Sequence, residues 1–211
     1  MDQKFDQTVN SWKKFLNSQN LRSNLISASM YLTAWESLES AVIDQLRGFY
    51  SIGYEEDDWV CGERYRSQVL VRHKSPFRAS LLWFLEMNAV NQEDLEIADR
   101  IREHRNEIAH RLPEFIFSTE KQIDLELFRS LIALVAKVDK WWIREIEVPT
   151  NPDFDNAELT EDDYAKAMSG RMIMLNLMIT LATGDNNEVS KWNKEFEQAI
   201  DDLKSTGNPF S

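Results

Sequence analysis

The sequence predicts an all-α protein, a helical bundle followed by a C-terminal helical hairpin. Only 6 Gly and 5 Pro occur among 211 residues, so turns are few and elements are long, which favours helices over many short strands. Apolar residues recur at steps of three and four along most of the chain, the period of an amphipathic helix. With 43% hydrophobic residues and 7 Trp, the chain can bury a sizeable core.

The first long helix is predicted around residues 25–46. Its apolar positions follow the helical period and are Leu25, Ile26, Tyr31, Trp35, Leu38, Val42 and Leu46. We expect it to end near Gly48, a residue type common just beyond helix C-termini. The acidic residues 55–58 that follow are expected to be irregular.

Two further helices are marked by their capping residues. Ser75 before Pro76 has the pattern of an N-cap followed by the first helical residue. Asn91 is expected to cap the next helix, and Pro113 to end it, because proline cannot continue the backbone hydrogen bonds of a helix.

The fourth helix is predicted from Asp124 to about Glu147, where Pro149 and Pro152 close it. Residues 149–160 lack periodicity and are the best linker candidate. We therefore expect a helical domain over 1–150 and a helical extension over 151–211.

This extension is expected to be a hairpin that completes the core or binds a partner. Thr160 would cap a helix that reaches Gly184, and a last helix would span about 187–203.

Composition limits the classes of partner. The formal net charge is −12 and the pI is about 4.8, which argues against nonspecific binding to nucleic acid, because phosphate binding depends on Lys and Arg. A single cysteine, Cys61, and an N-terminus without the apolar stretch of a signal peptide predict a reducing, cytoplasmic setting without a membrane span.

The predicted helix around Arg105 carries an unusual residue in its apolar stripe. At about 100° per residue, Arg105 falls in the middle of an arc formed by Ile97, Ala98, Ile101, Ile108, Ala109 and Leu112. A guanidinium keeps its charge and is costly to bury unpaired. We therefore expect an anionic group to face Arg105.

Beside that stripe, Arg102, Asn106 and His110 are spaced i, i+4, i+8 and form one row. His110 can exchange a proton near neutral pH, whereas Arg and Asn are suited to holding a phosphate. The row is a plausible phosphodiester site. In the alternative interpretation, Arg105 pairs with Glu36 or Glu39, His110 lies at a helix C-terminus without a catalytic role, and Arg102 is solvated.

The segment 101–110, Ile-Arg-Glu-His-Arg-Asn-Glu-Ile-Ala-His, resembles the R-N-x-x-x-H signature of the HEPN superfamily, over about residues 23–147. This resemblance implies a HEPN-like bundle and a ribonuclease site across a homodimer, with Arg105, Asn106 and His110 as catalytic residues. It also implies a toxin–antitoxin or antiviral setting, with an antitoxin or defence-complex protein as a partner. Other members of the superfamily are catalytically silent modules for dimerisation, nucleotide binding or protein interaction.

The chain departs from one HEPN subgroup. Members paired with nucleotidyltransferase antitoxins carry Tyr two residues after the motif His, where this chain has Leu112. Control by nucleotide transfer to that position is therefore not expected.

A basic segment is the natural candidate for tracking RNA phosphates. Residues 64–78 contain no acidic side chain and carry the cations Arg64, Arg66, Arg72, Lys74 and Arg78, with His73 among them. Tyr65 and Phe77 could stack on bases there. A solvated loop is the alternative.

No cofactor and no metal site are predicted. The three His and one Cys show no ligand spacing, and the acidic residues 55–58 lack the pattern of a calcium loop. The adjacent Trp141 and Trp142 are expected to point to different sides, one of them outward into an interface.

Overall fold

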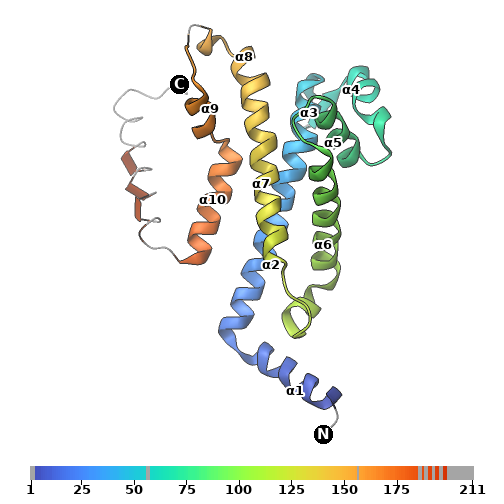
Figure 1. The fold of residues 1–211 in the computed structure, drawn as a ribbon, viewed down its shortest axis with the longest axis vertical. Helices are drawn as coiled ribbons and strands as arrows, with labels where there is room; N and C mark the ends of the chain where they lie inside the picture. Colours follow the sequence, from blue (N-terminus) through green and yellow to red (C-terminus); the bar gives the residue numbers. More distant parts are fainter. Residues whose placement is uncertain are drawn as a thin grey trace. The chain divides into compact units, whose positions relative to one another are not determined.

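The computed structural model describes residues 3–55, 58–155, 157–184, 187, 190–191, 193–194 and 197–198. It is predominantly helical, as predicted (Figure 1). The chain divides into two compact units, residues 1–169 and 170–211. The expected linker, residues 149–160, therefore lies inside the first unit.

The first unit contains most of the elements, in the order shown in Figure 1. Its α-helices are α1 (Gln3–Leu16), α2 (Ser18–Glu39), α3 (Gln45–Phe49), α4 (Glu63–Gln68), α5 (Pro76–Glu86), α6 (Gln92–Phe117), α7 (Leu125–Trp142), α8 (Val148–Thr150) and α9 (Glu161–Lys166). π-helical turns cover Ser40–Asp44 and Ile143–Glu147, and 3₁₀ turns cover Leu70–Arg72 and Pro152–Phe154. The second unit contains α10 (Gly170–Thr183).

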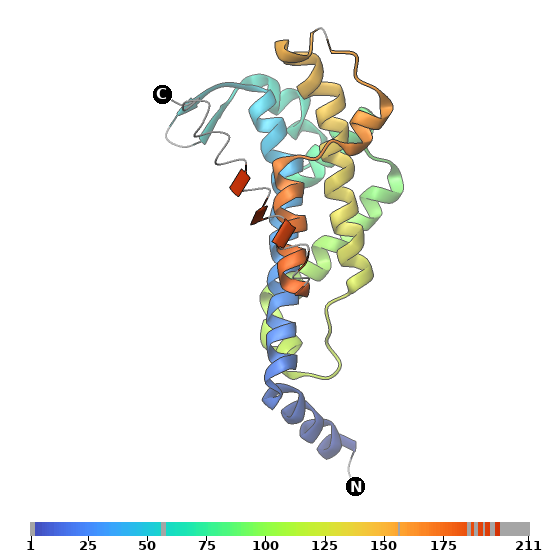
Figure 2. The same ribbon diagram turned by 90° about the vertical axis from the view of Figure 1, so that its left-hand side faces the viewer.

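The core of the first unit forms where α2, α6 and α7 run side by side (Figures 1 and 2). Each helix contributes side chains that are fully buried, among them Tyr31, Leu38, Ile101, Ile108, Leu131 and Val135. Removing these apolar surfaces from water is the main stabilising contribution to such a bundle. The Tyr31 hydroxyl is also satisfied, because it donates a hydrogen bond to the Ile101 carbonyl at 3.3 Å.

The predicted first helix is confirmed and extends further than expected at its N-terminus. α2 begins at Ser18, where the Asn17 side chain accepts a hydrogen bond from the Asn20 amide. The helical course continues through the π-helical turn and ends with α3 at Phe49.

The predicted caps Ser75, Asn91 and Thr160 are also confirmed. Their side chains, and that of Asp124, each accept a hydrogen bond from the backbone amide three residues later. At Asn91 and Thr160 an aspartate in the third helical position returns the bond, forming a capping box. These bonds satisfy amides that the helix itself leaves without partners.

Pro113 does not end its helix, contrary to the prediction. Arg111 adopts non-helical angles (φ −129°, ψ 27°), and the chain then re-enters a helical course to Phe117. Proline lacks the amide needed for a bond to the fourth preceding carbonyl but is tolerated in a first helical turn. The backbone break at Arg111 therefore moves Pro113 into the start of a new helical segment.

Two other expectations were wrong. Glu55 and Asp58, the ends of the acidic segment expected to be irregular, belong to an antiparallel strand pair, β1 (Ser51–Glu55) with β2 (Asp58–Cys61). The single helix expected from residue 160 to 184 is two helices, because Ala167 adopts an extended conformation and α10 starts at Gly170. The helix expected over about 187–203 falls largely on residues that lie outside those described.

Of the two adjacent tryptophans, one of which was expected to point outward, Trp142 is buried and Trp141 is half-buried. The Trp141 ring packs against Trp83 at 6.0 Å and Phe84 at 5.7 Å, while Trp142 contacts Phe84 at 6.2 Å and Phe49 at 5.8 Å. Aromatic residues from α3 and α5 thus surround the end of α7.

Candidate functional site

Arg105 lies at the edge of the buried face of α6 and is held in place by two residues of α2. Its Nη2 donates to the Glu36 carboxylate at 3.1 Å, and the guanidinium lies 5.5 Å from the centre of the Trp35 ring. On its own helix, Nη1 donates to the Asn106 Oδ1 at 3.3 Å. The expected anionic group is therefore Glu36, as in the alternative interpretation from the sequence.

The Arg105 side chain remains partly open to solvent. Its exposed fraction is 29%, and that of Glu36 is 64%. Ile101 and Ile108 are buried, whereas Ala109 is exposed, so the buried stripe at this level lies to one side of Arg105. The prediction that Arg105 sits in the middle of the stripe was wrong, because the face that contacts α2 and α7 shifts along this long helix. The Arg105 Nε is buried without a hydrogen-bond partner among the described residues.

Asn106 and His110 are both exposed on the solvent side of α6. His110 makes no hydrogen bond or ion pair within the described part of the chain, and it is the last residue before the break at Arg111. His110 lies five positions after Arg105 in the helix, which corresponds to a rotation of about 140° and a rise of about 7.5 Å. One copy of the chain therefore does not point both side chains at one atom.

His104 shows how a histidine on the same helix is used structurally. Its Nε2 accepts a hydrogen bond from the Asp124 amide at 3.1 Å, and its ring contacts Tyr31 and Phe115. Burial lowers the pKa of His104, so the neutral ring that can accept this bond is favoured. Sequence spacing gave no signal for this role, because Asp124 belongs to the next helix.

Arg102, the first residue of the expected row, is paired within the helix. Its Nη2 lies 3.6 Å from Asp99 Oδ1. Asp99 also accepts a hydrogen bond from Arg78 at 3.0 Å, and Arg78 donates a second one to the Leu95 carbonyl. Arg78 therefore ties α5 to α6 and is not an open phosphate ligand.

The basic segment divides into paired and unpaired cations. Arg72 donates two hydrogen bonds to the Glu86 carboxylate, of 3.0 and 2.5 Å, and these bonds lower the pKa of Glu86. Arg64, Arg66 and Lys74 are exposed, and their side chains form no hydrogen bond or ion pair with other described residues. These three remain available to an anionic ligand.

Tyr65 and Phe77 cannot stack on bases in this structure, so that hypothesis was wrong. Both side chains are buried, and the Phe77 ring packs 4.8 Å from that of Trp35. Phe77 occupies a core position because α5 packs against α2 near Trp35.

Among the described residues, no group of three or more His, Cys, Asp or Glu side chains is placed to hold a metal ion. Likewise, no helix within these residues is long and apolar enough to cross a membrane.

The motif region thus consists of an anchored arginine, an exposed amide and an exposed imidazole on one helix. Comparison with protein-family models, with curated proteins and with solved structures gave no match.

Proposed function

We propose that this chain is a metal-independent endoribonuclease of the HEPN type that acts as a homodimer. The observation that carries this proposal is the contrast between the two histidines of α6. His104 is half-buried and hydrogen-bonded, whereas His110 is exposed one helical turn beyond Asn106. An exposed His and Asn beside a partly open Arg105 are the groups that phosphodiester cleavage requires.

In the proposed reaction, the 2′-oxygen of RNA attacks the adjacent phosphorus and the bond from phosphorus to the 5′-oxygen breaks. A base takes the proton of the 2′-hydroxyl, and an acid gives a proton to the leaving 5′-oxygen. The products are a 2′,3′-cyclic phosphate and a 5′-hydroxyl. His110 serves as acid or base, Arg105 stabilises the charge on the phosphate, and Asn106 orients it.

Dimerisation supplies the second proton-transfer group, which a single chain lacks. Each copy has one exposed imidazole on α6, whereas the reaction uses two proton-transfer groups. If two copies of α6 meet across a two-fold axis, both His110 side chains enter one cleft. In a toxin–antitoxin or antiviral setting, a partner protein would then restrain the enzyme.

The test is incubation of the purified protein with total RNA in excess EDTA. We expect cleavage that leaves 2′,3′-cyclic phosphate ends and that is lost in His110→Ala. The matched control is His73→Ala, which removes another exposed histidine and should leave cleavage intact. Chelator-sensitive cleavage, or cleavage that survives His110→Ala, would contradict the proposal.

A second candidate is a catalytically silent HEPN module for dimerisation, nucleotide binding or protein interaction. The Arg105–Glu36 pair favours it, because the cation already has an anionic partner 3.1 Å away. The two candidates differ in one result: a silent module forms dimers but leaves total RNA intact, and its His110→Ala variant behaves like the wild type.

A further inference from the structure

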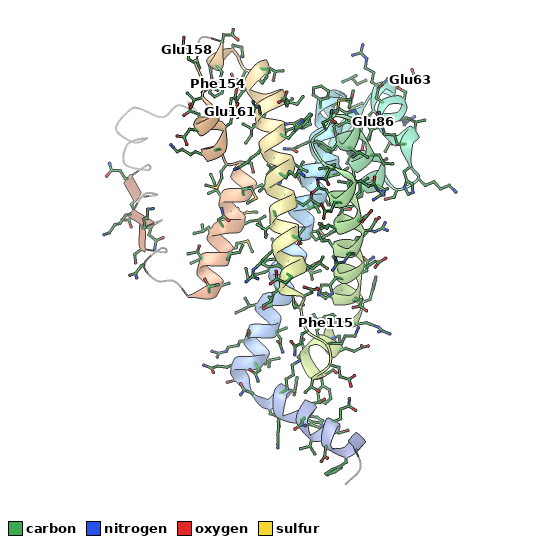
Figure 3. All side chains as sticks on the ribbon, viewed as in Figure 1. Glu63, Glu86, Phe115, Phe154, Glu158 and Glu161 are labelled. Atoms are coloured by element: carbon green, nitrogen blue, oxygen red, sulfur yellow. The ribbon has the colours of Figure 1, made fainter. Side chains whose placement is uncertain are left out.

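The first unit contains a cavity of about 330 Å³ between the end of α3 and the base of the β-hairpin. This volume lies at the lower end of the range for small-molecule sites, about 300–1,000 Å³. A ligand the size of one nucleotide would therefore fit. Figure 3 labels Glu63, which lines the cavity, at one end of the unit and Phe115 toward the other.

One wall of the cavity is apolar and open to solvent. Phe49 is 47% exposed and Ile52 is 79% exposed. The Phe49 ring is held by edge-on contacts with Tyr50 at 5.0 Å and Trp142 at 5.8 Å. The Tyr50 hydroxyl accepts a hydrogen bond from Trp83 at 3.1 Å. The Phe49 ring is therefore held in place before any ligand binds, which reduces the entropic cost of binding.

A glycine shapes the floor of this cavity. A Cβ atom at Gly62 would lie 3.0 Å from the Ile52 Cγ2. A larger residue would push Ile52 away from the hairpin base and change the wall.

Charged groups of both signs stand beside this apolar wall. Glu63 and Arg64 line the cavity, and the Arg64 side chain has no partner among the described residues. Two other arginines of the basic segment form ion pairs with carboxylates, Arg72 with Glu86 and Arg78 with Asp99. In a chain of net charge −12, a cation left open at a cavity is a selective site for an anion.

We infer that this cavity holds one base of single-stranded RNA, with the adjoining phosphate bound by Arg64. An aromatic ring provides a surface on which any base can stack. A carboxylate such as that of Glu63 can accept a hydrogen bond from the exocyclic amino group of adenine or cytosine. The ligand is single-stranded because a paired base is already stacked and cannot enter a cavity. The inference rests on the proposed function in taking RNA as the ligand, and the cavity contributes to binding and not to the chemistry at His110.

The experiment measures binding of a fluorescent 2′-O-methyl oligoadenylate of eight nucleotides, which cannot be cleaved by 2′-hydroxyl attack. We expect Ile52→Ser and Arg64→Gln to weaken binding about tenfold, and Arg64→Gln to lower the slope of affinity against salt by about one phosphate contact. Both residues are exposed, so neither variant should impair folding. Phe49→Leu keeps an apolar side chain but removes the stacking ring, and should act like Ile52→Ser.

The control is Arg22→Gln. Arg22 is exposed on α2 and lies outside both the basic segment and the cavity lining, so this variant should change affinity less than about twofold. Equal losses for Arg64→Gln and Arg22→Gln would indicate general charge attraction and overturn the inference. Unchanged binding in Ile52→Ser and Phe49→Leu would also overturn it.

Two further binding measurements show whether the base comes from single-stranded RNA, a duplex or a free nucleotide. A duplex of the same sequence should bind at least tenfold more weakly than the single strand. If AMP alone binds as tightly as the oligonucleotide, the ligand is a free nucleotide and the single-strand inference fails. If the wild type does not cleave total RNA but the pattern of cavity variants holds, the proposed function fails while the cavity assignment stands.

Discussion

At the scale of single residues, α6 separates structural side chains from available ones. His104 accepts a hydrogen bond from the amide of Asp124, and Asp99 accepts one from Arg78 of α5, whereas Asn106 and His110 are exposed. Arg105 belongs to both sets, because Glu36 and Trp35 hold it while part of its guanidinium stays open. Substitutions at these positions therefore distinguish a stabilising role from a catalytic one.

The first prediction concerns Arg105→Ala. Exposed ion pairs and cation–π contacts contribute little, so we expect the free energy of unfolding to fall by about 1–2 kcal/mol at most. RNA cleavage should fall about 100-fold or more, as when a group that stabilises transition-state charge is removed. Chemical denaturation and a cleavage assay measure the two effects.

Glu36→Gln is the matched control for Arg105→Ala, since it removes the charge of the partner and keeps the cation. It should retain cleavage. If Arg105→Ala instead unfolds the protein, the Arg105–Glu36 pair is structural and the silent-module candidate gains support.

The second prediction concerns pH. Burial lowers the pKa of His104 in the folded protein, against the opposing effects of Asp124 and Glu107 and with a smaller contribution from Lys121. The unfolded chain therefore binds a proton more readily, and stability should fall as pH falls through about 6.5. The melting temperature between pH 7 and about 5 measures this fall.

His104→Gln should flatten this dependence, because its amide oxygen can accept a hydrogen bond without titrating. His110→Ala should leave the dependence as in the wild type, since His110 is exposed. A similar flattening in both variants would show that His104 is not the source.

At the scale of elements, one lysine joins α1 to the end of α6. The Lys14 Nζ donates to the carbonyls of Phe115 at 3.3 Å, Ser118 at 2.5 Å and Lys121 at 3.3 Å. A cation at this position satisfies carbonyls that the helix leaves open and interacts favourably with the helix dipole. Aromatic contacts of Trp12 and Phe15 with Phe117 support the same junction.

The third prediction is that Lys14→Met destabilises the protein by about 1–3 kcal/mol, because charged hydrogen bonds are lost while the apolar stem is kept. Lys13→Met is the control, since Lys13 is exposed on the same helix and should cost less than about 0.5 kcal/mol. Denaturant unfolding measures both. Equal costs would mean that the Lys14 contacts contribute nothing specific.

At the scale of the whole molecule, the proposed chemistry depends on two copies of the chain. Arg105 and His110 of one copy diverge around α6, so a single chain offers one exposed imidazole and one anchored cation in different directions. A second copy restores the missing proton-transfer group.

The fourth prediction follows from this dependence. When wild-type protein exchanges subunits with an excess of His110→Ala protein, cleavage per wild-type chain should fall, because mixed dimers keep one imidazole. Native mass spectrometry would verify the exchange. Cleavage that stays proportional to the wild-type chains, or full activity in a species that elutes as a monomer, would contradict the dimer site.

The sequence by itself determined the long helices of the bundle and the starting points of α5, α6, α7 and α9, but not α1 or α4. The three- and four-residue periodicity over 25–46 and 124–147 is local, and caps such as Ser75 and Asn91 act within one turn of the helix. The exposed positions of Asn106 and His110 followed from helical spacing alone, whereas the same spacing wrongly placed Arg105 in the middle of the apolar stripe.

Only the tertiary structure decided which of these side chains are paired. Arg105 meets Glu36 across 69 positions of sequence, Arg72 and Arg78 meet carboxylates on other elements, and burial removes Tyr65 from the ligand-binding surface. The course of α6 beyond Pro113 and the hairpin next to the cavity were likewise missed. Helical periodicity and helix caps depend on neighbours within a few residues. Pairing and burial depend on which faces of distant helices pack together, and local sequence patterns do not show this.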